Sequence, residues 1–153
     1  MQFKRTVEAA AKRAGDEGED LVEMSISSEA PYERWFGIEI LRHSPDAVDL
    51  SRLADGRHPF LVGHDTEKQV GVIKRAFIDT DDKKLRGAVK FSRSAYAQEI
   101  RQDVEDEIRT LISVGYMIDE IEEVAKAADG SETVIRRMSG EEFEREMLKE
   151  HGD

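Results

Sequence analysis

Alternating hydrophobic and polar residues mark several short stretches of the chain, and a two-residue period is typical of β-strands that bury one face. In the segment LVEMSISS, Val22, Met24 and Ile26 alternate with polar neighbours. The segments QVGVIKRAFIDT and KLRGAVKFS flank the turn-forming DTDDK, which predicts a β-hairpin. Trp35 and Phe36 are expected to pack in the core. Strands are expected over residues 21–28, 34–43, 58–65, 69–80, 84–92, 111–124 and 133–138.

Apolar residues that recur every three to four positions predict helices elsewhere in the chain. The clearest helix covers residues 93–111, and Ser92 or Ser94 can cap its start. Ser139 and Glu142 have the spacing of a capping box at the start of a terminal helix. The apolar positions of the clearest helix are Ala97, Ile100, Val104, Ile108 and Leu111. A short helix is also expected within residues 1–14, and a short helix or turn over residues 44–56.

The order of these elements predicts an α+β fold, in which short antiparallel strands form a β-rich barrel or sandwich with flanking helices. A chain of 153 residues is long enough to bury one substantial core. The glycines and acidic residues of GDEGED interrupt the first segment, which is typical of a flexible leader. The expected parts are a leader over residues 1–20, a β-rich domain over residues 21–138 and an acidic C-terminal helix over residues 139–153.

Composition narrows the classes of function. The net charge is −11, and residues 98–153 carry 17 acidic against 7 basic residues. This acidic segment argues against nucleic-acid binding, because phosphates require cationic partners, and a solvated acidic face is the simplest interpretation. No apolar run is long enough to cross a bilayer, and the first residues lack a signal-peptide core, so no membrane partner is expected. The absence of cysteine excludes disulfides and favours an intracellular protein.

Two residues are candidates for hydrolytic chemistry. Ser113 lies in the apolar run LISVGYMI, and His64 lies 49 residues earlier in FLVGHD, so both resemble buried strand residues. A serine hydroxyl is a weak nucleophile at neutral pH and needs a base within hydrogen-bond reach, most often a histidine. In contrast, His43, His58 and Asp65 match no standard spacing of metal ligands. No metal or organic cofactor is therefore expected.

Four motifs follow one another between roughly Met24 and Ile118. They are an apolar strand that ends in His-Asp, then Gly-x-Val/Ile, then the helix entry Phe-Ser-x-Ser-x-x-Ala-x-Glu, and finally Ser-x-Gly-Tyr. In this order they resemble the HK97-type prohead proteases of tailed bacteriophages, and most closely the versions fused ahead of a major capsid protein. That family is similar in fold to the herpesvirus assembly proteases, so the resemblance implies a β-barrel surrounded by helices.

The resemblance also implies a function. The chain would be a serine endopeptidase in which His64 is the general base and Ser113 is the nucleophile. Its substrates and partners would be scaffold segments and the phage major capsid protein, cleaved inside the procapsid in the host cytoplasm, and self-association is a further expectation. The donors for the oxyanion stay open between backbone N–H groups near the serine and an arginine such as Arg93.

The chain departs from the family pattern at two places. Gly63 stands where the family usually has Asn or Asp, which is expected to affect loop geometry more than chemistry. The family also continues to a further barrel strand with an acidic residue, whereas here SETVIRRM runs directly into the terminal helix. Glu141 and Glu142 lie in helical surroundings and are not assigned as the third catalytic member. A capsid-assembly or scaffolding protein without activity, or an unrelated β-rich binding domain, are the alternative interpretations.

Overall fold

A computed structural model of the chain describes residues 2–14 and 19–151. The described chain divides into a larger compact unit, Thr6–Val114, and a smaller one made of residues 2–5 and 115–151. Strands β1 (Gln2–Glu8) and β9 (Leu111–Met117) pair with each other, and each contributes residues to both units. The predicted α+β class is confirmed, since antiparallel strands dominate and two α-helices accompany them.

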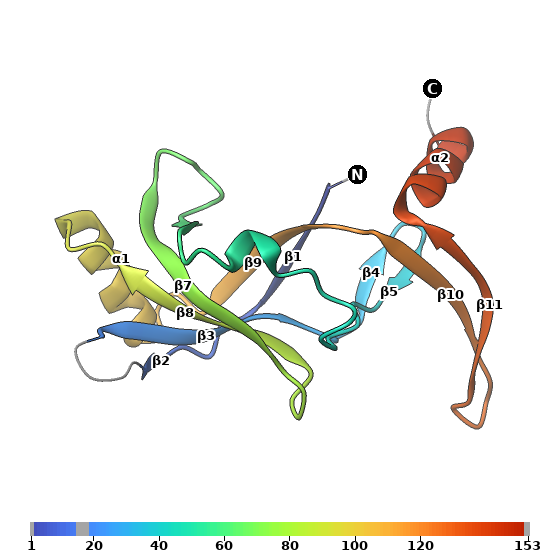
Figure 1. The fold of residues 1–153 in the computed structure, drawn as a ribbon, viewed down its shortest axis with the longest axis horizontal. Coiled ribbons are helices and arrows are strands. Elements are labelled where there is room, and N and C mark those ends of the chain that lie inside the picture. Colours follow the sequence, from blue (N-terminus) through green and yellow to red (C-terminus); the bar gives the residue numbers. More distant parts are fainter. Residues whose placement is uncertain (1, 15–18, 152–153) are drawn as a thin grey trace. The chain divides into compact units, whose positions relative to one another are not determined.

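The larger unit is built on a five-stranded antiparallel sheet in the order β2-β3-β8-β7-β6 (Figure 1). The predicted hairpin is confirmed as β7 and β8. The expected closed barrel is not confirmed, because β2 and β6 are open edges among the described strands, and β1 and β9 pair with each other instead of joining them. The elements are β2 (Lys12–Ala14), β3 (Leu21–Ser28), η1 (Ser51–Leu53), β6 (His58–Leu61), β7 (Gln69–Asp79), β8 (Lys84–Phe91) and α1 (Ala95–Glu105).

The core of the larger unit lies where β3, β7 and β8 meet helix α1. Val22, Val70 and Val89, one from each strand, are completely buried. Ala97 and Ile100 of α1 belong to the same cluster, which confirms the predicted inward face of the helix. The hydrophobic face of the sheet and the helix stripe therefore cover each other, as two packed layers of secondary structure require.

Helix α1 begins where the sequence predicts but ends earlier. Ser94 caps it, since its hydroxyl accepts a hydrogen bond from the Ala97 N–H at 3.2 Å. At the other end Glu107 adopts a φ of +59°, and the Ile108 N–H donates to the Asp103 carbonyl at 2.8 Å. This pattern closes a helix through one left-handed residue. As a result Ile108, which was expected in the core, is 72% exposed.

The segment 34–43, expected as one strand, folds back on itself. It belongs to the antiparallel pair of β4 (Tyr32–Arg34) and β5 (Gly37–Glu39). Trp35 lies in the turn between the two strands and is 60% exposed, so its expected place in the core is wrong. Its ring contacts the ring of Phe36 edge-on, with centroids 5.3 Å apart.

The expected helix within residues 1–14 is wrong, because strands β1 and β2 occupy this segment. Phe3 and Arg5 of β1 are buried while the residues beside them are exposed, which is the two-residue period of a strand. Phe3 stacks on Tyr116, with ring centroids 5.9 Å apart. Part of the expected leader, residues 15–18, lies outside the described residues, and its flexibility stays a prediction.

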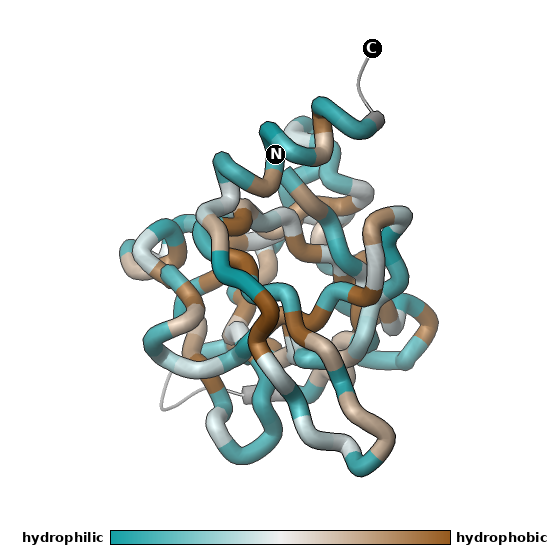
Figure 2. Tube along the Cα trace, turned by 90° about the vertical axis from the view of Figure 1, so that its right-hand side faces the viewer, coloured by the Kyte–Doolittle hydropathy of each residue, from teal (hydrophilic) through white to brown (hydrophobic). Residues whose placement is uncertain are grey.

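The smaller unit contains a β-hairpin and a helix: β10 (Glu120–Lys126), β11 (Glu132–Ser139) and α2 (Gly140–His151). The strand expected over residues 111–124 is divided into β9 and β10. The capping box is confirmed, because Ser139 and Glu142 each accept a hydrogen bond from the other's backbone N–H at 3.1 Å. The helix is mostly hydrophilic, with hydrophobic positions spaced along it (Figure 2), and Phe143 is its buried residue.

A buried arginine connects α1 to the start of β3. Arg101 is 7% exposed, and its guanidinium donates two hydrogen bonds to the carboxylate of Asp20, at 2.6 and 2.8 Å. It donates a third hydrogen bond to Glu105 at 2.8 Å. The bonds to Asp20 are the largest cause of a pKa for Arg101 that lies above its ordinary value. The side chain therefore stays charged and ties helix α1 to the segment that leads into β3.

We expect Arg101→Ala to lower the free energy of unfolding by about 2 kcal/mol, because it removes buried packing as well as two ion pairs. Urea denaturation followed by circular dichroism measures this change. Arg109→Ala is the matched control, since Arg109 also pairs with an acid but is exposed, and its loss should change stability by no more than about 0.5 kcal/mol. Equal effects of the two substitutions would contradict a structural role for Arg101.

Candidate active site

Ser113 lies in the middle of β9 and is half-buried. Its neighbours Ile112 and Val114 pack against the core of the larger unit. Because side chains alternate between the two faces of a strand, Ser113 lies on the opposite face, away from that core. Within the described residues its hydroxyl has no hydrogen-bond partner. The prediction that Ser113 is placed on a strand is confirmed.

His64 lies in a surface turn instead of a strand. Strand β6 ends at Leu61, and the Asp65 N–H donates to the Val62 carbonyl at 3.1 Å, which closes a four-residue turn. Gly63 and His64 occupy the two central positions with φ values of +62° and +58°, as in a type I′ turn. His64 is exposed, so the expectation of a buried strand histidine is wrong.

The geometry of this turn accommodates either glycine or a small polar residue at position 63. A φ of +62° suits glycine, and asparagine and aspartate are the other residues that tolerate it best. A β-carbon at Gly63 would meet no atom within 4 Å. Asparagine or aspartate at position 63 would therefore fit the same turn.

Hydrogen bonds make the loop between β6 and β7 compact. The Val62 N–H donates to the Lys68 carbonyl at 3.0 Å and joins the two ends of the loop. The Lys68 N–H donates to the carbonyl of Asp65 at 2.9 Å, and the Asp65 carboxylate accepts the Glu67 N–H at 2.9 Å. These bonds fix the backbone on which His64 is carried.

The structure does not join the two candidate residues by a hydrogen bond. Within residues 2–14 and 19–151, the Ser113 hydroxyl forms no hydrogen bond with the His64 imidazole. No carboxylate of these residues forms a hydrogen bond or an ion pair with the His64 ring. Catalytic hydrogen bonds are often long in the absence of substrate. The roles of Ser113 as nucleophile and His64 as base therefore stay predictions.

Other candidate groups lie elsewhere in the described chain. Arg93 is exposed between β8 and α1 and forms no ion pair with a described residue, so its guanidinium is available to an anion. Glu142 uses its carboxylate to cap α2, with Glu141 exposed beside it. His43 is buried, and its Nδ1 lies 2.8 Å from the Leu41 carbonyl oxygen. No three metal-binding side chains of the described residues lie close enough together to hold a metal ion.

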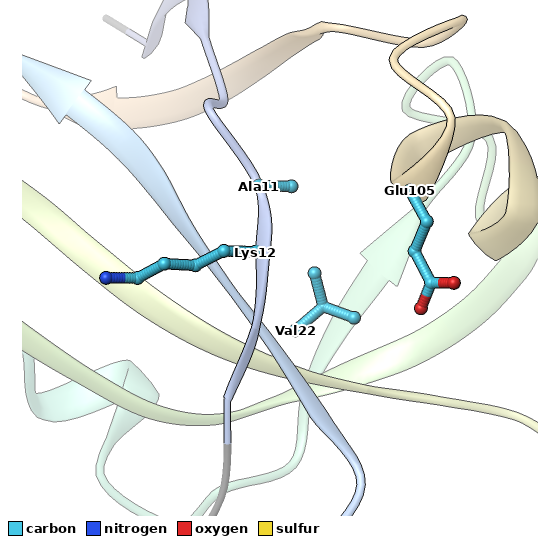
Figure 3. A pocket seen from close by; sticks show the side chains of 4 residues that line it. All are labelled: Ala11, Lys12, Val22 and Glu105. Carbon is cyan, nitrogen blue, oxygen red and sulfur yellow. The ribbon is translucent and has the colours of Figure 1, made fainter.

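An open hollow in the larger unit is lined by Ala11, Lys12, Val22 and Glu105 (Figure 3). The Lys12 side chain extends away from the other three, and its ammonium lies 3.8 Å from Glu23. The Glu105 carboxylate is engaged with Arg101. Both charged groups already have partners and neither candidate catalytic residue lines the hollow, so it offers no place for the reaction.

Comparison with known proteins relates the chain to bacteriophage capsids. It is 46% identical over 101 residues to the major capsid protein of Halomonas phage phiHAP-1. This alignment covers 64% of the present chain and 16% of the capsid protein, so the chain corresponds to a small part of that longer protein. No protein-family model matches the chain, and no solved structure matches it.

The turn geometry predicts that His64 costs stability. Glycine adopts a positive φ without the steric penalty of a β-carbon, so we expect His64→Gly to raise the free energy of unfolding by about 0.5–1 kcal/mol. Urea denaturation measures the change. The control is His58→Gly, because His58 is an exposed histidine within strand β6 and its φ is not positive. There the substitution should lower stability by a similar amount, and a loss of stability at both positions would refute the turn assignment.

Proposed function

We propose that this chain is a serine endopeptidase module that cleaves capsid or scaffold segments during maturation of a bacteriophage procapsid. The observation that carries the proposal is the 46% identity over 101 residues with a phage major capsid protein, which supports a capsid-related role. The order of the His-Asp and Ser-x-Gly-Tyr motifs, which resembles prohead proteases, supports the hydrolytic part. A fold relation to the herpesvirus assembly proteases belongs to the same proposal.

The proposed reaction needs one nucleophile, one base and one anion-binding group. The Ser113 Oγ would bond to the scissile carbonyl carbon while His64 takes its proton. The imidazolium would return that proton to the leaving amine as the peptide C–N bond breaks. Water activated by the same imidazole would then hydrolyse the acyl-enzyme and restore the Ser113 hydroxyl. Backbone N–H groups or Arg93 would stabilise the oxyanion.

The location of the candidate residues is consistent with attack on an extended, exposed segment. Ser113 lies on a strand face away from the hydrophobic core, and His64 is exposed on a hydrogen-bonded loop. A working pair requires the His64 ring to come within about 3 Å of the Ser113 Oγ in the substrate complex. Substrate binding would therefore have to bring the loop that carries His64 close to the strand that carries Ser113.

A second candidate function is a capsid-assembly or scaffolding module without hydrolytic activity. One observation favours it: within the described chain no hydrogen bond joins Ser113 to His64, as an assembled pair would show. The acidic segment 98–153 would then attract basic capsid surfaces electrostatically.

The proposed setting is the interior of the procapsid in the host cytoplasm, with the major capsid protein and scaffold segments as partners. Self-association of the chain belongs to the same proposal, since β2 and β6 leave open sheet edges in the described fold. None of the helices in the described part of the chain has both the length and the apolar character needed to cross a membrane.

Cleavage dependent on Ser113 tests the proposal. The chain is co-expressed with the major capsid protein of Halomonas phage phiHAP-1, and the fragments are compared for wild type, Ser113→Ala and His64→Ala. The purified proteins are also treated with a fluorophosphonate, which phosphonylates activated serines. We expect both substitutions to lower cleavage and labelling at least about 10³-fold, because the nucleophile and the base act as a unit.

Ser131→Ala is the control, since Ser131 lies in the exposed turn between β10 and β11 and should leave both readouts unchanged. Any cleavage of the phage protein that is independent of this chain would be the same in every arm, so only the difference that depends on Ser113 counts. If Ser113→Ala processes and labels like the wild type, the peptidase proposal is wrong. Retained co-assembly of that variant with the capsid protein would then support the scaffolding function.

A further inference from the structure

Asp65 is the residue on which the hydrogen bonds of the β6–β7 loop converge. Its N–H donates to the Val62 carbonyl at 3.1 Å, and its carbonyl accepts the Lys68 N–H at 2.9 Å. Its carboxylate accepts the Glu67 N–H, also at 2.9 Å. Of these three contacts, the last alone depends on the identity of the side chain. The carboxylate therefore selects one turn conformation directly after His64.

In a serine hydrolase the third member of the triad normally holds the histidine ring through a hydrogen bond. No carboxylate of the described residues makes that contact with His64, and this includes the adjacent Asp65. The constraint that the structure does contain acts on the backbone, through the hydrogen bonds that close the loop. The orientation of the imidazole would therefore be set by where the loop places its α-carbon.

The conformation of His64 shows that the loop enforces this placement. A φ of +58° is unfavourable for a residue with a β-carbon, and such conformations persist where the surroundings over-determine them. The turn on the C-terminal side of His64 is the one that the Asp65 carboxylate caps. Loss of this cap would release the loop and allow His64 to relax toward a common backbone conformation.

We propose that Asp65 is a positioning residue, which holds His64 for catalysis by fixing the loop backbone through its side-chain oxygen and without touching the imidazole. This inference rests on the proposed peptidase function. The inference predicts different effects for two substitutions of Asp65 that would both abolish catalysis if Asp65 were a triad acid. Asparagine has an oxygen that can accept the Glu67 N–H in the same way, whereas alanine has none.

The experiment compares Asp65→Asn with Asp65→Ala. Asp55→Ala is the matched control, because the Asp55 carboxylate accepts the Arg57 N–H at 2.9 Å with the same sequence spacing in a different loop. The first readout is the rate of Ser113-dependent fluorophosphonate labelling as a function of pH. The second is the hydrogen exchange of the Glu67 and Lys68 amides, followed by NMR, which does not require activity.

We expect Asp65→Asn to label within about threefold of the wild type, with the same pH profile, because the backbone contact is kept. Asp65→Ala should label about 10- to 100-fold more slowly, as misplacement of a catalytic group by about 1 Å would cause. Its Glu67 and Lys68 amides should exchange faster than those of the wild type. Asp55→Ala should match the wild type in both readouts.

Three results would overturn the proposal or its basis. A loss of about 10⁴-fold in Asp65→Asn would show that the carboxylate acts on the imidazole directly, as a triad acid does. Unchanged labelling and exchange in Asp65→Ala would show that the cap is dispensable. If the wild type shows no labelling that depends on Ser113, the peptidase function itself fails. Amide exchange alone then decides whether Asp65 holds the loop, and unchanged exchange in Asp65→Ala rejects that role as well.

Discussion

The candidate chemistry of this chain depends on the burial of one hydrophobic surface, the face shared by β3, β8 and β7. Ile112 and Val114 pack against this core from β9, and Val62 packs against it where the β6–β7 loop begins. Each such side chain contributes about 1.5–3 kcal/mol when it is fully buried, and proportionately less when it is partly buried. The same core thus fixes both the strand that carries Ser113 and the start of the loop that carries His64.

Elements with a local signal could be predicted from the sequence. Strand β3 and the β7–β8 hairpin follow a two-residue hydrophobic period or a short apolar run, and the structure places their strands within one residue of the expected limits. Ser94 caps α1, while Ser139 and Glu142 cap α2 reciprocally. These features depend on residues that are neighbours in the chain, so the sequence contains all the information that determines them.

Features that depend on distant contacts or on unusual backbone conformations could not be predicted. The helical period continues through Ile108 and Leu111, yet both are exposed, because a glutamate takes the left-handed position where glycine is the usual signal. The first residues read as a helix, but pairing of β1 with β9 makes them a strand. The apolar run around Ser113 correctly predicts a strand. The apolar run before His64 also favours a strand, although the chain turns there and Gly63 was the signal of that turn.

The left-handed backbone at His64 also bears on which residues evolution would favour at this position. Glycine and asparagine suit the positive φ of a type I′ turn better than histidine does. Selection for folding alone would therefore tend to remove the imidazole. If a histidine were found at this position in related chains, its retention would therefore indicate a constraint other than folding.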